Sequence, residues 1–278
     1  MNHTKRSSGP RELYPEDAAD YMKGRDEQDY LLLDVRQPKE YEQGHLPGAS
    51  LISLPELPDA LAKLDRNKPT LVYCAMGGRS QSAARFLHNR GFQDVMNIIG
   101  GIQAWEGGVA EGPAGIEYRF ISGTESIEEI VRVAYAMEYG LGMFHQMAAD
   151  RAGDGELKKL LELLAKVEWR HMANVLEMLP PDAPLRQNPP EPPDDPSQTT
   201  MEGGMSVADF MEHNARFLQS TEGVLDLAMT IETQALDLYI QMAHSSQDEA
   251  TRKILLKIAH EEREHLAALG RLMDEKAG

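Results

Sequence analysis

Cysteine is almost absent from this sequence, because Cys74 is the only one in 278 residues. A single cysteine excludes a disulfide within the chain and any metal site built from four thiolates. A lone thiol is either a small buried apolar residue or a reactive group, and its neighbours decide between the two. The length itself predicts two domains, each large enough to bury its own core.

Positive charge and long apolar runs are also scarce. The formal net charge is −17, and the residues after position 110 carry −15 of it. Such an acidic excess repels nucleic acid and anionic membranes, because binding to phosphate needs clustered Lys or Arg. The sequence has neither a run of about 18 apolar residues that could span a membrane nor an apolar segment behind its basic N-terminus. We therefore expect no nucleic acid partner, no membrane partner and a cytoplasmic protein.

The first 110 residues alternate between strand-like and helix-like segments. Short apolar runs occur as LLLDV, TLVYC and VMNIIGG between Tyr30 and about Trp105. The segments between them include PELPDALAKL and SQSAARFLHNR, which have amphipathic patterns. This order is typical of βαβ units, so residues 1–110 are predicted to form an α/β domain with a parallel sheet.

The rest of the chain has helical periodicity and is predicted to form an all-α four-helix bundle over residues 119–278. Apolar residues recur every three or four positions within 127–150, 156–179, 223–244 and 250–273. This spacing predicts four long amphipathic helices. The stretch GGVAEGPAG favours an irregular linker between the domains. The proline-rich segment 180–205 favours an extended crossover between two helical hairpins, since proline interrupts both helices and strands.

Serine residues mark several predicted helix starts, because a side-chain oxygen can accept a hydrogen bond from a free N–H of the first helical turn. Ser206 is predicted to cap a short helix that ends near Gln219. Ser220 or Thr221 is predicted to cap the third long helix. Ser80 is predicted to cap the helix that follows Cys74.

Two Glu-x-x-His motifs and two further glutamates form a repeated pattern in the helical part. Each motif places its two side chains on one helix face, one turn apart. A single glutamate stands 30 residues before each motif, and the whole set repeats at an offset of 94. Carboxylates within apolar helix faces are costly unless they are paired or coordinated, and two metal ions would compensate them. The predicted metal ligands are Glu138, Glu168, His171, Glu232, Glu262 and His265.

This pattern matches the di-iron or di-manganese carboxylate arrangement of four-helix bundles. Over roughly residues 120–278 the chain resembles the ferritin-like superfamily, in particular its rubrerythrin-like branch. The resemblance implies a di-iron redox domain that acts on peroxide, oxygen or sulfur species. The expected cofactor is two iron ions, with manganese as the alternative. Rubrerythrins often carry a second, cysteine-ligated iron centre, which one cysteine cannot form, so electrons would come from an external donor or from the first domain.

The residues around Cys74 favour a reactive thiol. Cys74 follows the apolar run TLVY and precedes AMGGRS and a helical pattern, so it stands between a strand end and a helix start. Glycines in the loop permit a tight turn with inward N–H groups, and the helix start favours an anion. Arg79 adds a positive charge, which supports a nucleophilic thiolate. Cys74 and Arg79 are the predicted catalytic residues, and the predicted substrate-binding residues are Ala75, Met76, Gly77, Gly78, Arg79 and Ser80.

Three stretches carry a resemblance to rhodanese-like sulfurtransferases over about residues 12–108. They are DVRQPKEYEQGHLPGA, CAMGGRS and GFQDVMNIIGGIQAW. The resemblance implies that Cys74 takes sulfane sulfur from a small sulfur-containing anion such as thiosulfate, becomes a persulfide, and passes the sulfur to a thiol acceptor. The short loop from Cys74 to Arg79 is similar to sulfur-handling members rather than to phosphatase relatives.

Three functional hypotheses follow from the two parts. The first is a redox sulfur enzyme in which the persulfide and the di-metal site cooperate. The second is a sulfurtransferase whose bundle stores or senses metal. The third is a noncatalytic binding protein that keeps both folds. A homodimer is compatible with each of them.

Overall fold

The computed structural model describes residues 9–113, 126–190, 199, 201 and 205–277. The chain divides into two compact units, residues 1–115 and 116–278. The sequence predicts that the first domain ends at residue 110 and the second begins at residue 119, so the observed division lies between the two predicted limits. The predicted linker GGVAEGPAG covers residues 107–115, of which 114 and 115 lie outside the described residues, as do residues 116–125 after it.

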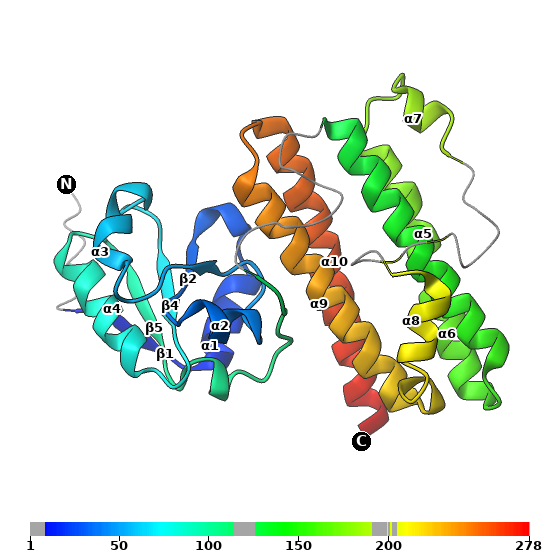
Figure 1. The fold of residues 1–278 in the computed structure, drawn as a ribbon, viewed down its shortest axis with the longest axis horizontal. Coiled ribbons are helices and arrows are strands. Elements are labelled where there is room, and N and C mark those ends of the chain that lie inside the picture. The colour runs from blue at the N-terminus through cyan, green and yellow to red at the C-terminus, as the bar shows by residue number, and fades with distance from the viewer. Residues whose placement is uncertain (1–8, 114–125, 191–198, 200, 202–204, 278) are drawn as a thin grey trace. The chain divides into compact units, whose positions relative to one another are not determined.

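The first unit contains a five-stranded sheet in the order β1-β5-β4-β2-β3 (Figure 1). Every neighbouring pair of strands is parallel, which confirms the predicted α/β fold with a parallel sheet. The strands are β1 (Arg11–Leu13), β2 (Leu31–Asp34), β3 (Ser50–Leu51), β4 (Thr70–Tyr73) and β5 (Val95–Ile98). The three-residue strand β1 lies before Tyr30, outside the pattern that the apolar runs predicted, because its residues are mostly exposed.

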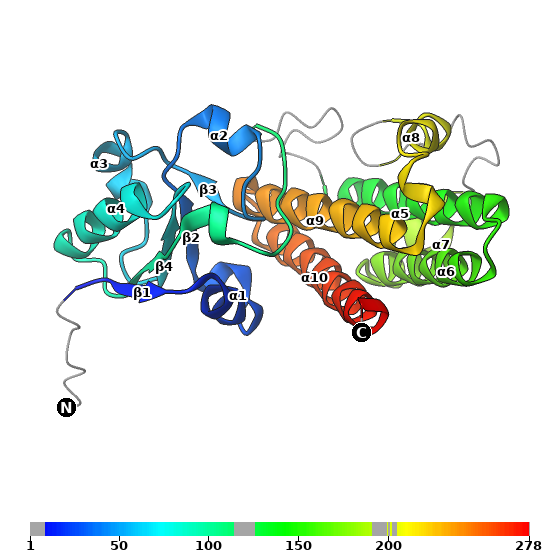
Figure 2. The ribbon, with the colours of Figure 1, turned by 90° about the horizontal axis from the view of Figure 1, so that it is seen from below.

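Helices cover both faces of this sheet because the strands are apolar on both sides, as parallel strands usually are. Leu32, Leu71 and Met96 pack with Ala18 on one face. Leu33, Val72 and Cys74 pack with Ala83 and Leu87 on the other. Figure 2 shows α1 and α4 on opposite sides of the strands. The helices are α1 (Pro15–Lys23), α2 (Pro38–Glu42), α3 (Leu57–Ala60) and α4 (Gly78–Asn89), with 3-10 turns η1 (Glu27–Asp29), η2 (Leu61–Lys63) and η3 (Gly101–Ala104).

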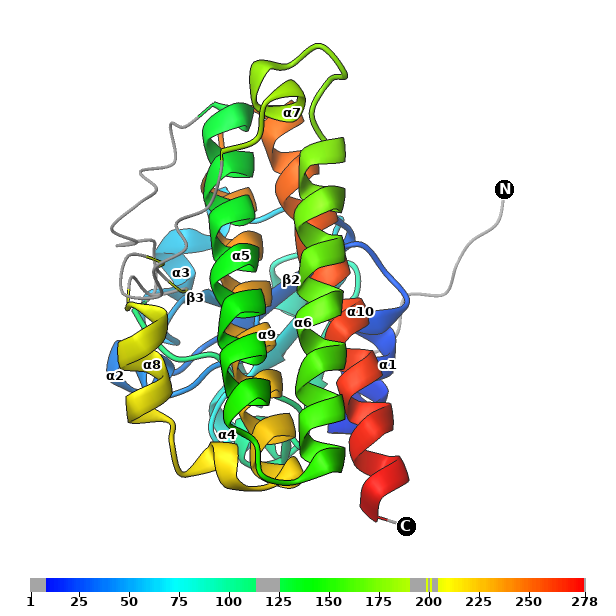
Figure 3. The ribbon, with the colours of Figure 1, turned by 90° about the vertical axis from the view of Figure 1, so that its right-hand side faces the viewer.

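The second unit contains four long helices that lie side by side (Figure 3). All four agree with the predicted amphipathic segments to within a few residues. They are α5 (Ile127–Arg151), α6 (Gly155–Glu177), α9 (Thr221–Ser245) and α10 (Glu249–Ala277). Helix α5 packs most extensively against α6, and α9 against α10, so the unit is built from two helical hairpins. Among the described residues, none of the helices is long and apolar enough to cross a membrane.

The connection between the two hairpins differs from an entirely extended crossover. A one-turn helix, α7 (Pro184–Gln187), lies within the proline-rich segment. Proline is tolerated there because the first helical N–H has no partner within the helix and its loss costs little. Residues 191–198, 200 and 202–204 of the predicted crossover lie outside the described residues.

The predicted serine caps are correct at two of three positions. The Ser206 side chain accepts a hydrogen bond from the Asp209 N–H, and the Ser220 side chain accepts one from the Gly223 N–H. The short helix α8 (Val207–His213) nevertheless ends six residues before the expected Gln219. The chain turns after it and continues into a separate 3-10 turn, η5 (Phe217–Gln219).

Two apolar cores of the second unit are separated by a polar layer. One core includes Ile130 of α5, Val175 of α6 and Ile258 of α10. The other includes Phe144 of α5 and Leu161 of α6. Along each long helix, the predicted ligands lie between residues of the first core and residues of the second. The six ionisable side chains of the four helices therefore lie in a layer between the two apolar cores.

Candidate functional site

Cys74 lies directly after β4, at the carboxyl edge of the sheet, and its side chain is buried with 2% relative exposure. The loop turns sharply at Gly77, whose φ of 97° is in the left-handed region that favours glycine. This turn directs the Gly77 N–H toward the Cys74 Sγ at 3.1 Å. The Ser80 hydroxyl lies 3.5 Å from the same sulfur. The loop thus surrounds the thiol with hydrogen-bond donors.

These donors affect the acidity of the thiol. Burial alone would raise the pKa of Cys74, but the Ser80 hydroxyl and the backbone N–H groups of Ser80, Met76 and Gly77 outweigh burial and lower the pKa. A lowered pKa increases the fraction of the nucleophilic thiolate near neutral pH. The structure therefore holds Cys74 in surroundings that suit a nucleophile.

Ser80 does not cap helix α4, contrary to the sequence-based prediction. The N-cap is Gly77, and Ser80 is the third helical residue. Its hydroxyl also lies 3.0 Å from the Gly77 carbonyl oxygen, so its one proton serves either that oxygen or the Cys74 sulfur at a time. The prediction was wrong because Gly77 and Gly78 allow the helix to begin before Ser80, the first residue whose side chain could cap it.

The turn after β5 supports the Cys74 loop (residues 74–80), because glycine at position 101 lets the two backbones approach closely. Gly101 has a φ of 58°, and a Cβ atom there would lie 2.1 Å from the Cys74 carbonyl oxygen. The close approach allows the Ile102 N–H to donate to the Cys74 carbonyl at 2.9 Å and the Gln103 N–H to donate to the Ala75 carbonyl at 3.1 Å. The backbone on both sides of the thiol is therefore held by the turn that follows β5.

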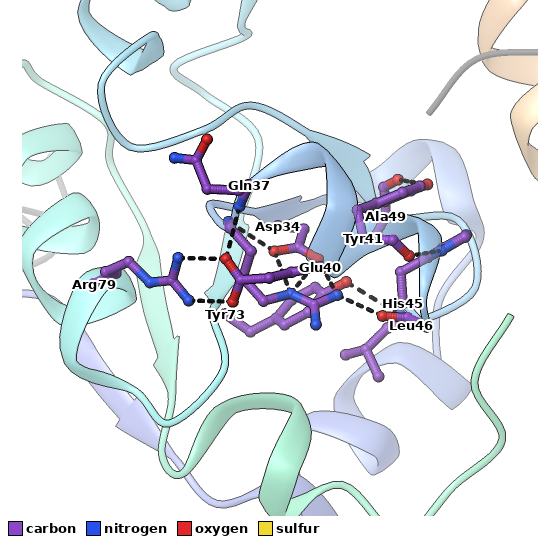
Figure 4. A network of polar contacts seen from close by, with 11 residues as sticks. Asp34, Gln37, Glu40, Tyr41, His45, Leu46, Ala49, Tyr73 and Arg79 are labelled. Carbon is purple, nitrogen blue, oxygen red and sulfur yellow. Dashed lines mark hydrogen bonds and ion pairs between the residues drawn. The ribbon is translucent and has the colours of Figure 1, made fainter. Parts of the chain in front are cut away.

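The Arg79 side chain is held by Glu40 of α2. Its two terminal nitrogens donate to the two Glu40 oxygens at 2.7 Å and 2.6 Å, as the dashed lines in Figure 4 mark. The Arg79 hydrogen bonds, opposed by slight burial, lower the pKa of Glu40 to about 2. Sequence reasoning did not identify Glu40, because the contact joins residues 39 positions apart and leaves no local pattern.

A buried ion pair stabilises the segment that carries Glu40. Asp34, at the end of β2, accepts a hydrogen bond from the Arg36 guanidinium at 2.6 Å, and both side chains are almost fully buried. The Arg36 guanidinium also donates to the Gly44 carbonyl at 2.6 Å. Tyr41 and Ala49 are joined by a hydrogen bond from the Tyr41 hydroxyl to the Ala49 carbonyl at 2.8 Å (Figure 4). The network fixes the position of α2.

The other predicted substrate-binding residues line the same loop with different exposures. Gly77 and Ser80 are buried, Ala75 and Arg79 are partly exposed, and Gly78 is exposed. Met76 is 70% exposed, which is unusual for a large apolar side chain. The loop thus offers an apolar residue as well as backbone N–H groups to a molecule that approaches Cys74.

In the second unit the structure brings the six predicted ligands together as two groups of three. Within each group, one potential ligand atom per residue lies within 4.8 Å of the others, and all six residues are buried. The His171 and His265 rings stack with centroids 3.6 Å apart and an interplanar angle of 5°. The groups, one from each hairpin, are Glu138, Glu168 and His171, and Glu232, Glu262 and His265.

Burial and mutual repulsion perturb the ionisation of this cluster. Burial first, and then the charge of Glu262, raises the pKa of Glu138. Burial and the charges of Glu232 and Glu138 raise the pKa of Glu168 well above its usual range. Burial, opposed by a hydrogen bond from His265 and assisted by Glu232, raises the pKa of Glu262 to about 8. The residues from the two hairpins therefore act on one another as a single cluster.

A protonated histidine balances part of the negative charge of the four glutamates. Burial would lower the pKa of His265, but the carboxylates of Glu232 and Glu262 raise it to about 10. Glu168 Oε2 is buried and accepts no hydrogen bond from any described residue. Such an oxygen is costly without a partner. The donor set of carboxylate oxygens and imidazole nitrogens fits iron or manganese.

Two cavities adjoin the cluster. The cavity between α6 and α10 has a volume of about 460 Å³, and Glu168, His171, Glu232 and His265 contribute to its wall. The cavity near α5 and α9 has a volume of about 20 Å³. The first can admit a small organic molecule to the cluster, whereas the second has room for about one water molecule.

His145 lies next to the cluster on α5 without belonging to either group of three. Its Nε2 atom is 3.9 Å from Glu168 Oε1, and its Nδ1 atom has no hydrogen-bond partner among the described residues. Burial lowers the pKa of His145 to about 3, so the ring is neutral. His145 therefore packs beside the Glu168 carboxylate as a neutral side chain.

A buried thiol whose pKa is lowered, in an N–H-lined loop at the carboxyl edge of a parallel sheet, is an arrangement that suits a thiol-dependent transferase. The chain belongs to the family described as "Rhodanese-like domain", whose model matches residues 17–107. The match ends before the second unit and says nothing about it.

Individual relatives of this family align with the same part of the protein. Thiosulfate sulfurtransferase GlpE of Pseudoalteromonas translucida is 34% identical over 86 residues, which are 31% of this chain and 82% of that protein. Thiosulfate sulfurtransferase GlpE of Coxiella burnetii is 40% identical over 78 residues, which are 28% of this chain and 73% of that protein. The crystal structure of a rhodanese-like domain protein from Staphylococcus aureus covers 34% of this chain and 90% of that chain at 27% identity, with a TM-score of 0.32.

Proposed function

We propose that the first unit is a sulfurtransferase in which Cys74 carries the transferred sulfur. The observation that carries this proposal is the buried Cys74 sulfur with its lowered pKa, held by the Gly77 N–H at 3.1 Å. The similarity to thiosulfate sulfurtransferases gives the substrate class, a small sulfane-sulfur anion such as thiosulfate.

The reaction consists of two nucleophilic displacements. The Cys74 thiolate attacks the outer sulfur of thiosulfate, a new S–S bond forms, and sulfite leaves with the electron pair of the broken S–S bond. An acceptor thiolate then attacks the outer sulfur of the persulfide, and the Cys74 thiolate leaves. The loop N–H groups favour the anionic sulfur both before the first step and after the second.

To test this proposal, the full chain is treated with thiosulfate, the excess thiosulfate is removed, and the mass of the protein is measured by mass spectrometry. The native protein should gain the mass of one sulfur atom, and Cys74→Ser should gain none. Incubation of the loaded protein with a thiol should return the original mass. Equal labelling of both proteins, or no labelling of either, would contradict the proposed function.

We also propose that the second unit is a ferritin-like bundle that holds two metal ions, iron or manganese. The observation that favours it is the buried cluster of four carboxylates and two imidazoles within 4.8 Å in each group. A cation would compensate the burial and the mutual repulsion that raise the pKa of three of the glutamates.

Each hairpin would hold its own ion through one glutamate from its first helix and the Glu-x-x-His motif of its second. When bound, the ions would supply redox chemistry toward peroxide, oxygen or sulfur species. Apolar cores lie on both sides of the cluster along the bundle, and the cavity between α6 and α10 gives a small molecule access to it. An external protein would serve as electron donor.

Metal analysis of the full chain after anaerobic loading with ferrous iron tests this second proposal. The native protein should retain two ions, and Glu168→Ala should retain fewer because a ligand is missing. Glu264→Gln is the matched control, since this exposed neighbour lies on α10 beside the cluster but outside both groups. Cys74→Ser should retain two ions as well. Full occupancy in Glu168→Ala, or a native content well below two, would refute the di-metal assignment.

Coupling between the two units is the first of the three functional hypotheses and has a separate test. Peroxide consumption by the iron-loaded full chain is measured with and without a sulfane sulfur donor. A rate that depends on the donor and on Cys74 supports a two-step redox sulfur enzyme. A rate that depends on neither supports a sulfurtransferase with an independent metal bundle.

A further inference from the structure

The positive charge of Arg79 is already neutralised within the domain by Glu40. Both terminal nitrogens of Arg79 donate to Glu40. The hydrogen bonds and charge of Glu40, opposed by slight burial, raise the pKa of Arg79, and the charge of Cys74 adds to this shift. The Arg79 and Glu40 side chains are 36% and 34% exposed, so both are accessible to a molecule in solution. A donor molecule therefore approaches an ion pair rather than an unpaired cation.

Glu40 is fixed in this position by its own helix. Its Oε2 atom accepts a hydrogen bond from the Gln37 N–H at 3.1 Å, which completes the capping box at the start of α2. The same oxygen accepts the 2.7 Å bond from Arg79. Displacing Glu40 from Arg79 would therefore disturb a helix cap as well as an ion pair.

The other side chain presented by the loop is apolar. Met76 is 70% exposed, although burial of such a large apolar side chain is favourable. It lies two residues after Cys74, adjacent to the partly exposed Ala75. An apolar group on a donor would cover the Met76 side chain while its sulfur reaches the thiol.

We propose that the Cys74 loop selects sulfane sulfur donors with low charge and an apolar body, and that Glu40 is the specificity-determining residue that disfavours the thiosulfate dianion. This inference rests on the proposed sulfurtransferase function and specifies its substrate class. Organic thiosulfonates and organic persulfides belong to this class.

The physical reason is the scaling of Coulomb energy with charge. Thiosulfate bears two negative charges, so the fixed Glu40 carboxylate cancels about twice as much of the attraction by Arg79 for thiosulfate as for a monoanion at the same place. An organic thiosulfonate has one negative charge and an apolar substituent that can contact Met76. Its reaction is balanced in the same way: Cys74 attacks the outer sulfur, the S–S bond breaks, and the sulfinate leaves with the electron pair.

The experiment compares two donors that deliver the same sulfur atom to Cys74. The full chain is mixed with thiosulfate or with benzenethiosulfonate, and the second-order rate constant of persulfide formation is measured by quenched mass spectrometry. Because the protein product is identical, only recognition and displacement of the donor differ. We expect faster loading from benzenethiosulfonate in the native protein.

Glu40→Gln removes the charge and keeps an amide oxygen that can accept the Gln37 hydrogen bond. Thiosulfate loading should accelerate about tenfold and benzenethiosulfonate loading about threefold, since a monoanion experiences half the change in Coulomb energy. Glu42→Gln is the matched control, because Glu42 is an exposed acid of the same helix outside the Arg79 ion pair. It should leave the ratio of the two rates unchanged.

Met76→Ser tests the apolar half of the inference at an exposed position. It should slow benzenethiosulfonate loading about threefold more than thiosulfate loading, the loss expected for partial coverage of one apolar side chain. Circular dichroism of each variant checks that the fold is retained.

Failure of the inference is distinguishable from failure of the proposed function. If neither donor loads sulfur onto Cys74, the sulfurtransferase proposal itself is wrong. If both donors load but the rate ratio is the same in the native protein, Glu40→Gln and Met76→Ser, the donor selectivity is overturned and the sulfurtransferase proposal stands. A ratio that shifts equally in Glu42→Gln would also overturn it, because the effect would then arise from net charge.

Discussion

Gly101 offers the sharpest test of how the Cys74 loop (residues 74–80) is supported. In Gly101→Ala, the new Cβ would lie 2.1 Å from the Cys74 carbonyl oxygen and 2.8 Å from the carbonyl carbon of Ala75. These atoms are backbone, so the turn must move away from the loop. Two hydrogen bonds, from the Ile102 and Gln103 N–H groups, would be lost or lengthened.

The magnitude follows from two contributions. A non-glycine residue at positive φ costs roughly 1–2 kcal/mol. Loss of two backbone hydrogen bonds adds about 1 kcal/mol each. Gly101→Ala should therefore lower the free energy of unfolding of the first unit by about 3–4 kcal/mol. Persulfide formation should also slow, because the backbone on both sides of the thiol shifts.

Gly91→Ala is the matched control for the conformational contribution. Gly91 has a φ of 93°, and a Cβ there would meet nothing within 4 Å. Its cost should be only the roughly 1–2 kcal/mol of positive φ. Unfolding by urea is followed by Trp105 fluorescence, with every variant made in a Trp169→Phe background so that the signal reports the first unit. A loss in Gly101→Ala no larger than in Gly91→Ala would refute the steric argument.

Two further predictions concern the same unit. Ser80→Ala removes a hydrogen bond that favours the thiolate, so the pKa of Cys74 should rise and its alkylation by iodoacetamide at neutral pH should slow. An unchanged pH profile of alkylation would mean that the Ser80 hydroxyl proton points to the Gly77 carbonyl instead. Asp34→Ala leaves the Arg36 guanidinium buried without its carboxylate and should cost about 3–5 kcal/mol in urea unfolding, whereas a cost below about 1 kcal/mol would show that the pair is well solvated.

Local patterns were sufficient for the main elements of both units. The runs LLLDV, TLVYC and VMNIIGG correspond to β2, β4 and β5, because strands buried on both faces need continuous apolar residues. The four amphipathic segments correspond to α5, α6, α9 and α10. Strands β1 and β3 and helices α2 and α7 were not predicted, because strands of two or three residues and helices of four or five leave almost no periodic signal. Helix α1 was not predicted either, since it lies before Tyr30, where the predicted pattern begins.

The candidate sites divide in the same way. Glu168 and His171 could be paired from sequence, because a spacing of three places them on one helix face. Their partner Glu138 was inferred from the duplication at an offset of 94, and the structure brings these three side chains within 4.8 Å. Their role as metal ligands remains a prediction. The stacking of His171 on the corresponding His265 was not predicted, since no local rule relates the two hairpins.

The sequence alone determined which residues share a strand or a helix face and that Cys74 stands at a strand end. Those relations depend on spacings of a few residues and on burial. Tertiary structure decided which charges meet. Arg79 is five positions from Cys74 and 39 from Glu40, yet Glu40 binds both of its terminal nitrogens. That pairing depends on how the Asp34–Arg36 ion pair and the segment after β2 place α2 beside the loop, and no periodicity in the chain encodes a distance between two such segments.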